Sequence, residues 1–336
     1  MKRISQRDIA KILGVNVSTI SRALRGLEGV GEDLRQKIMS LAEDHGYRPN
    51  PFAISLRFDT THTIGIVMPD LSYNYYAQIV RRIEHDARKQ GFMCIITDSG
   101  DTYAGEVECV EHLEKLHVDG IIICLSQETT DFLHLERLKK NGIPVVLFER
   151  TANANFSSVC INDHILTRQA TLHLIDGGAK NIAFLGGPNT MSQSAERKHA
   201  YLEVLRERKI PIRKELVKCS PLSLNSGLAD TLDLLDLPEP PDAILATHGM
   251  LALSSIQAVL SRGLRVPEDI AIIGFVSNWV SDITNPRMTF VMQNMKEMGS
   301  KAFQLLFDQM NGDNRVQHVL VNARLELRDS TKKIII

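Results

Sequence analysis

The sequence predicts a small all-helical helix-turn-helix module with a hinge helix, joined to an α/β body of two doubly wound lobes. In the first 46 residues, apolar side chains recur at helical spacing and turn glycines follow them. After a short proline-containing linker, strand-like apolar runs alternate with amphipathic helices. A chain of 336 residues is also too long for one ordinary core, which favours a small module plus a larger bilobed body.

The composition excludes several protein classes. Hydrophobic residues make up 43% of the chain and no apolar stretch reaches membrane-spanning length, so we expect a soluble protein with no membrane contact. The N-terminus lacks an apolar signal-peptide core, which favours a cytoplasmic location. The five cysteines are widely spaced and form no Cys-x-x-Cys motif, so we expect reduced core residues rather than disulfides or a zinc site.

Positive charge is concentrated at the N-terminus. Six basic residues and only one acid, Asp8, lie between Lys2 and Arg25, although the net charge of the whole chain is -1. A local basic surface on a near-neutral protein is typical of a DNA-binding module, and a solvated basic helix would have the same composition.

Two short helices are predicted next to each other at the N-terminus. Apolar spacing predicts a first helix from Gln6 to Leu13, and Gly14 follows where a left-handed residue ends a helix. A second helix begins near Asn16 or Ser18, whose side chains can cap it, and ends at Gly26.

A residue triplet and a third helix complete the module. Ala10 is small where the helices would cross, Gly14 occupies the turn, and Ile20 is a branched apolar residue that would lock the second helix. A third helix fits Glu32 to His45, with Gly46 ending it. We therefore predict a helix-turn-helix domain over residues 1–46.

One face of the second helix is predicted to contact DNA. If Ile20 is buried, the opposite face carries Val17, Ser18, Ser21 and Arg22, and we expect Thr19 to contact DNA as well. Arg22 can bond guanine bidentately and Val17 can meet a thymine methyl group in the major groove. Alternatively, Arg22 touches only phosphate, which positions the module without specifying sequence, and Thr19 only steadies the backbone.

A hinge helix and linker are predicted over residues 47–60. Asn50 can cap a helix whose first residue is Pro51, and that helix would be barely two turns long. Helices this short are marginal alone, so we expect this one to form when it packs against a partner such as DNA.

The body contains repeated β/α units, which indicate parallel sheets. The predicted strands are Ile64–Met68, Met93–Thr97, Gly120–Cys124, Pro144–Leu147, Asn181–Leu185, Ala243–Ala246 and Ile270–Gly274, and the predicted helices are Tyr76–Gln90, Gly105–Lys115, Ser194–Arg208 and Met250–Ser261. Sheets of this kind bind ligands beyond the C-terminal ends of their strands, and two facing lobes make a cleft.

The N-terminal module and its linker resemble the LacI/GalR family of bacterial repressors. The resemblance is carried by Asp8-Ile9-Ala10, Gly14-Val15, Thr19-Ile20-Ser21-Arg22-Ala23-Leu24 and Tyr47-Arg48-Pro49-Asn50. It implies that the hinge helix folds on DNA and inserts Leu56 into the minor groove, with Ala53 one turn earlier, so that Asn50, Ala53 and Leu56 contact DNA. The alternative is that Leu56 only packs against the body. Asn16 and Gly31 depart from the usual serines, but both residue types are acceptable at a helix cap.

The resemblance extends over essentially the whole chain and implies a periplasmic-binding-protein-like body. It places an effector-binding and dimerisation domain at residues 61–336, with chain crossovers near Ile161 and Thr289. The first lobe would comprise about 61–160 and 291–328, and the second about 161–290.

Only some of the residues that form the family's effector pocket are present in this sequence. Tyr75, Glu149 and Arg197 match effector-contacting positions, whereas four others depart from common family residues: Asn162, Leu222, His248 and Val276. Replacing paired carboxylates removes acceptors for sugar hydroxyls and shifts the charge upward around Arg197, Arg150 and His248. Structural alternatives are a salt bridge from Arg197 to Glu196 or Glu203, and a core role for Tyr75.

These departures from the family pattern do not identify the effector. They are compatible with an anionic effector such as a phosphorylated sugar or a carboxylate. The alternatives are a neutral effector held in another pose, and no small effector at all, with regulation through a protein partner or through protein abundance.

No catalytic or cofactor motif is present. The sequence lacks Gly-x-Ser-x-Gly, His-Glu-x-x-His, Walker and Gly-x-Gly-x-x-Gly patterns, and its histidines are scattered, so we expect no enzyme activity, cofactor or metal. The resemblance implies instead a repressor of carbohydrate-related genes that binds operator DNA. One helix-turn-helix makes too few contacts for specific binding, so we expect a homodimer. The competing class is a solute-binding protein without a DNA function.

Overall fold

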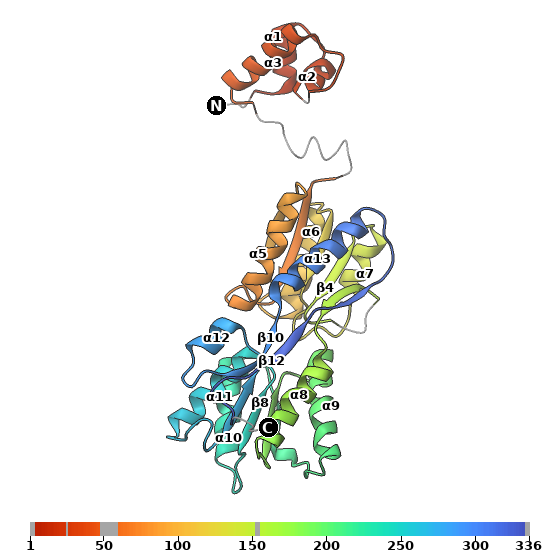
Figure 1. The fold of residues 1–336 in the computed structure, drawn as a ribbon. Helices are drawn as coiled ribbons and strands as arrows, with labels where there is room; N and C mark the ends of the chain where they lie inside the picture. Colours follow the sequence, from red (N-terminus) through yellow and green to blue (C-terminus); the bar gives the residue numbers. More distant parts are fainter. Residues whose placement is uncertain (1–3, 25, 48–59, 152–154, 333–336) are drawn as a thin grey trace. The chain divides into compact units, whose positions relative to one another are not determined.

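A computed structural model describes residues 4–24, 26–47, 60–151 and 155–332 of the chain. The chain divides into two compact units, Met1–Thr61 and His62–Ile336. Figure 1 shows the helices and strands of both units.

The N-terminal unit is a three-helix domain. Its helices are α1 (Gln6–Leu13), α2 (Val17–Leu24) and α3 (Glu32–Asp44). Ser5 and Asp8 form a capping box at the start of α1, and Gly14 ends it with a positive φ of 65°. Ile9, Ile20 and Ile38, one from each helix, are fully buried and form the core. The three predicted helices are therefore confirmed, the third ending one residue earlier than predicted.

The predicted hinge helix falls on residues that the structure does not describe. Asn50, Ala53 and Leu56 all lie outside the described residues.

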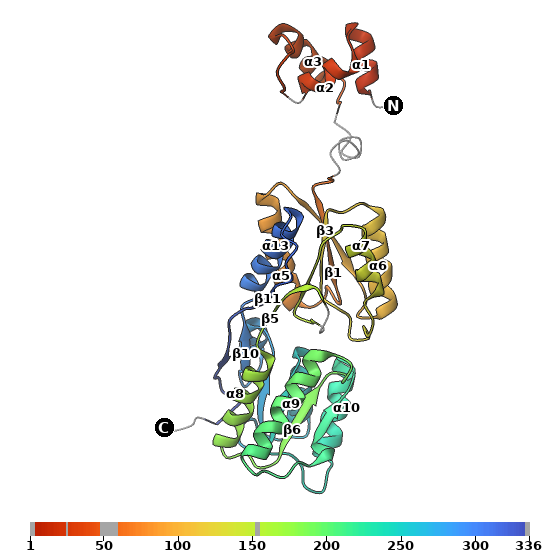
Figure 2. The same cartoon turned by 90° about the vertical axis from the view of Figure 1, so that its right-hand side faces the viewer.

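The first lobe of the body is an α/β sandwich around a parallel sheet. Its strands are ordered β11-β5-β4-β3-β1-β2, and every pairing between them is parallel. Helices α5 and α13 cover one face, and α6 and α7 cover the other (Figure 2). The elements are β1 (Thr63–Met68), α5 (Asn74–Lys89), β2 (Met93–Asp98), α6 (Tyr103–Lys115), β3 (Gly120–Ile123), α7 (Leu133–Lys140), β4 (Val145–Phe148), β5 (Ser157–Cys160), α13 (Met295–Met310) and β11 (His318–Leu320).

The apolar runs of the sequence form the inner strands of this sheet. All four residues of β3 and of β4 are buried, as expected for parallel strands covered on both faces. Gly65 in β1 lets α6 approach closely, since a Cβ there would lie 2.6 Å from a methyl carbon of Leu113.

The second lobe repeats this plan. Its sheet order is β12-β10-β9-β8-β6-β7, with α8 and α9 packed on one face and α10 and α11 on the other. The elements are α8 (Asp163–Asp176), β6 (Ile182–Gly186), α9 (Ser192–Glu207), the 3-10 helix η1 (Lys214–Leu216), β7 (Val217–Cys219), α10 (Leu224–Leu235), β8 (Ala243–Ala246), α11 (Gly249–Ser261), β9 (Ala271–Gly274), α12 (Asn278–Ile283), β10 (Thr289–Gln293) and β12 (Ala323–Glu326). The prediction of two doubly wound lobes is thus confirmed.

The lobe boundaries differ from those expected at the C-terminal end. The resemblance places residues 291–328 in the first lobe, yet β10 extends through Gln293 in the second sheet. After β11 the chain crosses once more, and β12 pairs antiparallel with β10 at the register Val291 to Leu325. The physical reason is backbone hydrogen bonding, because β12 pairs with the side of β10 that β9 leaves open. The second sheet therefore includes all of β10, through Gln293, and the returning strand β12, Ala323–Glu326.

The two lobes share one apolar core. A continuous cluster of buried side chains runs from Ile66 and Phe148 in the first sheet to Phe184 and Phe275 in the second lobe. The loops after the carboxyl ends of β1, β4, β8 and β9 line a cavity between the lobes, the position at which doubly wound sheets bind ligands.

Candidate functional sites: the interlobe cavity and the exposed face of α2

The second helix of the N-terminal unit exposes the face predicted to contact DNA. Val17, Ser18 and Arg22 are exposed, and Thr19 and Ser21 are half-buried. The opposite face is anchored in the core by Ile20 and Ala23, which are 0% and 2% exposed. Because one side of α2 is buried in the core, the predicted side chains lie on its other side. This is the arrangement that a recognition helix needs to contact bases in the major groove.

The body contains a cavity of about 430 Å³ between its lobes. The first lobe contributes the start of α5 and the residue after β4. The second lobe contributes α9, the segments after β8 and β9, and the last residue of β10. Its lining residues are Ser72, Tyr73, Asn74, Tyr75, Tyr76, Ala77, Glu149, Arg197, Thr247, His248, Gly249, Met250, Leu253, Phe275, Val276, Ser277, Trp279, Val280 and Gln293. This volume lies within the range of small-molecule pockets, about 300–1,000 Å³.

Five of the eight predicted effector residues line this cavity: Tyr75, Glu149, Arg197, His248 and Val276. The other three do not.

Arg150, Asn162 and Leu222 have structural roles in place of the predicted cavity contact. Arg150 points toward a smaller cavity of about 240 Å³, and its Nη1 donates to Asp101 Oδ1 at 2.5 Å. Asn162 caps α8 by accepting from the backbone of Ile165 at 3.0 Å. The backbone N–H of Leu222 donates to Gln127 of the other lobe at 3.0 Å.

Arg197 is held by an acid that is not among the predicted partners. Its Nε donates to Asp163 Oδ1 at 2.7 Å, and its Nη1 donates to the carbonyl oxygen of Thr247. Its guanidinium carbon also lies 4.1 Å from the centre of the Phe275 ring. The predicted alternative partners, Glu196 and Glu203, are therefore wrong. The acid at the start of α8 is Asp163, one residue after the Asn162 to which the resemblance pointed.

Burial and charge shift the pKa values of several ionisable groups near the cavity, including Asp163 and His248. Loss of solvent raises the pKa of Asp163 from 3.8 to about 6, although the neighbouring Arg197 pulls it in the other direction. Burial, together with the positive charges of Arg150 and Arg197, holds the pKa of His248 well below its usual value. His248 is therefore a neutral imidazole at pH 7.

Glu149 is the acceptor at the end of β4. Its carboxylate accepts from the hydroxyl of Tyr76 at 3.2 Å and the thiol of Cys124 at 3.2 Å, and from the amide of Gln193 at 3.3 Å. Its φ of 58° lies in the left-handed region, which is uncommon for a residue other than glycine. Backbone conformations of this kind cluster at active sites and ligand-binding sites.

Several residues of the lining were not predicted, among them two aromatic residues and an amide. Trp279 is 56% exposed, Tyr73 packs against His248 with ring centres 5.8 Å apart, and Gln293 accepts from the hydroxyl of Tyr75 at 2.8 Å. Within the described part of the chain, the buried Tyr73 Oη and His248 Nδ1 have no hydrogen-bond partner. Trp279 and Gln293 follow or end strands, so a systematic search of strand ends would have found them.

Sequence models and curated relatives agree on the class of protein. The model described as bacterial regulatory proteins, lacI family, matches residues 6–50, and the periplasmic binding protein-like domain matches residues 171–331. Catabolite control protein A of Priestia megaterium is 33% identical over 330 residues, which cover 97% of this chain and 98% of that protein. The HTH-type transcriptional regulator RegA of Clostridium saccharobutylicum is 30% identical over 331 residues, covering 97% and 99%.

Solved structures agree with the fold. The transcriptional regulator CelR in its cellobiose complex has a TM-score of 0.73 at 27% identity, covering 98% of this chain and 100% of that chain. The lac repressor dimer bound to operator and the anti-inducer ONPF has a TM-score of 0.84 at 23% identity, covering 98% and 99%, which supports the fold.

Among the helices of the described residues, none has both the length and the apolar composition needed to cross a membrane. The full-length match to a relative that is 33% identical assigns the chain to a family. The chain belongs to the lacI family of bacterial regulatory proteins, and it is a helix-turn-helix transcriptional regulator.

Proposed function

We propose that this regulator is a dimeric repressor of carbohydrate-related genes whose affinity for an operator is set by a neutral, saccharide-like ligand in the interlobe cavity. The observation that carries the proposal is the lining of the cavity, which combines hydroxyl-bonding groups with the exposed face of an aromatic side chain. Glu149 and Gln293 offer oxygen acceptors, and Trp279 offers a ring against which a sugar can pack.

The polar atoms without partners support a ligand with several hydroxyl groups. Tyr73 Oη and His248 Nδ1 are buried at the cavity and lack partners among the described residues. Leaving such groups unsatisfied is costly, and a bound hydroxyl would satisfy each of them.

The charge arrangement favours a neutral ligand over the anionic one suggested by the sequence. Arg197 is already paired with Asp163, and Arg150 is paired with Asp101 beside a different cavity. His248 is neutral, and Glu149 would repel a phosphate or carboxylate. The excess positive charge expected from the sequence is therefore compensated by Asp163 and Asp101.

Relatives support the same ligand class. CelR was solved with cellobiose, a neutral disaccharide, and it is 27% identical to this chain over nearly the whole length. Because the cavity lies between two lobes, a ligand that contacts both would favour one arrangement of the lobes over others.

We assign DNA binding to residues 1–46, with the exposed residues of α2 reading bases and residues 47–60 forming the hinge and linker. Two copies would read a pseudo-palindromic operator, since one module makes too few contacts. Such a regulator acts in the cytoplasm, and we propose no catalytic activity for it. The family assignment favours this function over that of a solute-binding protein.

The DNA part is tested by a gel shift with DNA from upstream of the chain's own gene. Specific retardation should weaken steeply as salt rises, because phosphate contacts release counterions. Absence of specific retardation on any fragment of the genome would contradict operator binding.

The ligand part is tested by calorimetric titration with neutral mono- and disaccharides, their phosphorylated forms and simple carboxylates. Saturable binding is expected from the neutral set, together with a change in operator affinity. Binding confined to the phosphorylated set would refute the neutral ligand. Regulation that requires a protein from the cell extract, with no response to any sugar, would favour a protein partner.

A further inference from the structure

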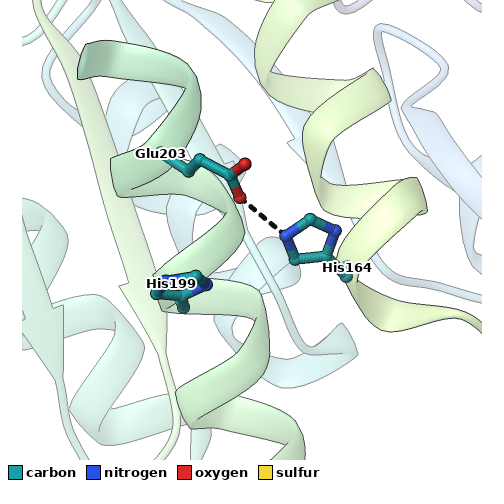
Figure 3. Close-up of side chains that lie close together, drawn as sticks. All are labelled: His164, His199 and Glu203. Carbon is teal, nitrogen blue, oxygen red and sulfur yellow. Dashed lines mark hydrogen bonds and ion pairs between the residues drawn. The ribbon is translucent and has the colours of Figure 1, made fainter. Parts of the chain in front are cut away.

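Three side chains suited to metal binding meet between two helices of the second lobe. His164 extends from α8, and His199 and Glu203 extend from α9 (Figure 3). One ligand atom from each residue lies within 4.8 Å of the other two. These residues do not line the interlobe cavity and have no part in the function proposed above.

Helix periodicity explains why two of the three groups converge. His199 and Glu203 are four residues apart on α9, so they share one face of that helix. A search for pairs of histidines on one helix does not find them, because this pair joins a histidine to a carboxylate. The third group comes from the neighbouring helix, which only the packing of α8 against α9 brings near.

The present geometry needs little change to hold an ion. His164 Nε2 is 2.7 Å from Glu203 Oε2, and the rings of His164 and His199 have centres 6.0 Å apart with planes inclined by 32°. Ligands bound tetrahedrally at about 2.1 Å from one ion lie about 3.4 Å from each other. His199 is exposed, so its side chain has room to rotate toward this spacing.

Arg168 positions the carboxylate of Glu203 by contacting the oxygen that does not face His164. Arg168 Nη1 lies 3.2 Å from Glu203 Oε1, which leaves Oε2 directed at His164. Arg168 is itself fixed by two hydrogen bonds to Glu207, at 3.0 and 2.7 Å. Such outer contacts orient metal ligands, although the positive charge of Arg168 lowers the affinity of the site.

The cluster is open to solvent. The side chains of His164 and Glu203 retain 31% and 36% exposure, and His199 is exposed. An ion can therefore enter from solution, and three protein ligands leave a further position for water.

We propose that His164, His199 and Glu203 form a binding site for a divalent transition-metal ion of the Zn²⁺ class. Two imidazole nitrogens and one carboxylate oxygen suit Zn²⁺, Co²⁺, Ni²⁺ or Cu²⁺, whereas Mg²⁺ and Ca²⁺ require oxygen ligands. The ion replaces the hydrogen bond between His164 and Glu203 and binds the neutral form of both imidazoles.

Binding at this place would link α8 to α9. His164 directly follows Asp163, and His199 is two residues beyond Arg197, so the site adjoins the ion pair beside the interlobe cavity. Because the ion binds only the folded arrangement of both helices, it should raise the stability of the body.

The test uses the untagged, full-length, metal-free protein titrated with ZnCl₂ in a calorimeter. Saturable binding of a single ion per chain is expected, with at least a tenfold loss of affinity in His199→Ala and in Glu203→Gln. The second variant keeps a hydrogen-bond acceptor for His164 but loses the charge. His112→Ala, which removes an exposed histidine from α6, is the matched control and should bind Zn²⁺ like the unmodified chain.

Two further measurements distinguish this site from cysteine ligation and from a general salt effect. Co²⁺ bound at the site should show visible absorption without a sulfur charge-transfer band, and ZnCl₂ but not MgCl₂ should raise the thermal midpoint. Both variants should keep the metal-free circular dichroism and thermal midpoint, because the substituted side chains are exposed or half-exposed. Equal Zn²⁺ affinity in all variants, a sulfur band, or no saturable binding would each overturn the proposal.

Discussion

Arg197 Nε donates a hydrogen bond to Asp163 Oδ1 at 2.7 Å, and this pair joins α9 to the first residue of α8 beside the interlobe cavity. Both side chains are largely withdrawn from solvent, with exposures of 3% and 11%. The pair therefore holds a charged group at the cavity without giving the cavity a net positive charge.

The raised pKa of Asp163 predicts a pH-dependent contribution to stability. Its folded-state pKa of about 6 exceeds the ordinary 3.8, so the folded protein takes up this proton first as the pH falls. Protonation of Asp163 therefore adds about 3 kcal/mol to the free energy of unfolding below about pH 4, and this contribution is lost as the pH rises through 6. Urea unfolding of the unmodified chain and of Asp163→Asn between pH 4 and 7 measures it. A stability difference that stays constant over this range would contradict the prediction.

Removing one partner of the pair should cost more than removing both. Arg197→Met leaves Asp163 buried without its counter-charge, and we expect a loss of about 3 kcal/mol in the free energy of unfolding at pH 7. The double variant Asp163→Asn with Arg197→Met should recover part of that loss. Additive effects in urea unfolding would show that the two side chains do not depend on each other.

Trp279 should report ligand binding directly, since it is the sole tryptophan in the sequence and lines the cavity. We expect its emission to change when a neutral saccharide binds. In Trp279→Phe the fluorescence signal should disappear while calorimetry still detects weakened binding. An emission unchanged by a ligand that calorimetry shows to bind would place that ligand elsewhere.

Gln293 at the end of β10 should contribute to ligand affinity. Gln293→Ala removes a potential ligand contact and the partner of the Tyr75 hydroxyl, so we expect about a tenfold weaker binding of the saccharide. Gln304→Ala, a change on an exposed part of α13, is the control and should leave ligand binding unchanged. Equal affinities for the two variants would argue against the cavity as the ligand site.

Arg22 should determine the operator sequence. If its guanidinium contacts a guanine, Arg22→Ala should weaken specific binding about tenfold and relax the preference at one base pair. Arg81→Ala removes an exposed charge from α5 and serves as the control in a gel-shift titration. An equal loss of specific and nonspecific affinity in Arg22→Ala would indicate a phosphate contact alone.

Substitution of Ile20 should destabilise the core of the N-terminal unit. This side chain is fully buried, so Ile20→Ala should cost about 3 kcal/mol and abolish DNA retardation, while calorimetric ligand binding by the body persists. Ile12→Ala is the matched control because Ile12 is 57% exposed on α1. Loss of ligand binding in Ile20→Ala would show that the two units do not fold separately.

Local patterns in the sequence were sufficient to predict the helices of the N-terminal unit and most strands of the two sheets. Apolar spacing and Gly14 determined α1 to the residue, and continuous apolar runs identified strands such as β3 and β8. These features depend on neighbours within a few residues, which is why periodicity reveals them.

The tertiary structure decided the remaining residues of the cavity and the whole of the cluster between α8 and α9. Asp163 meets Arg197 across 34 residues, and Tyr75 meets Gln293 across 218. Family resemblance identified Arg197, but it pointed to Asn162, one residue before the acid that pairs with it. The return of β12 to the second sheet was likewise missed, because a short strand at a sheet edge is selected by the unpaired β10 beside it. Sequence therefore determined which elements form, whereas long-range packing determined which charges compensate one another and which groups remain free for a ligand.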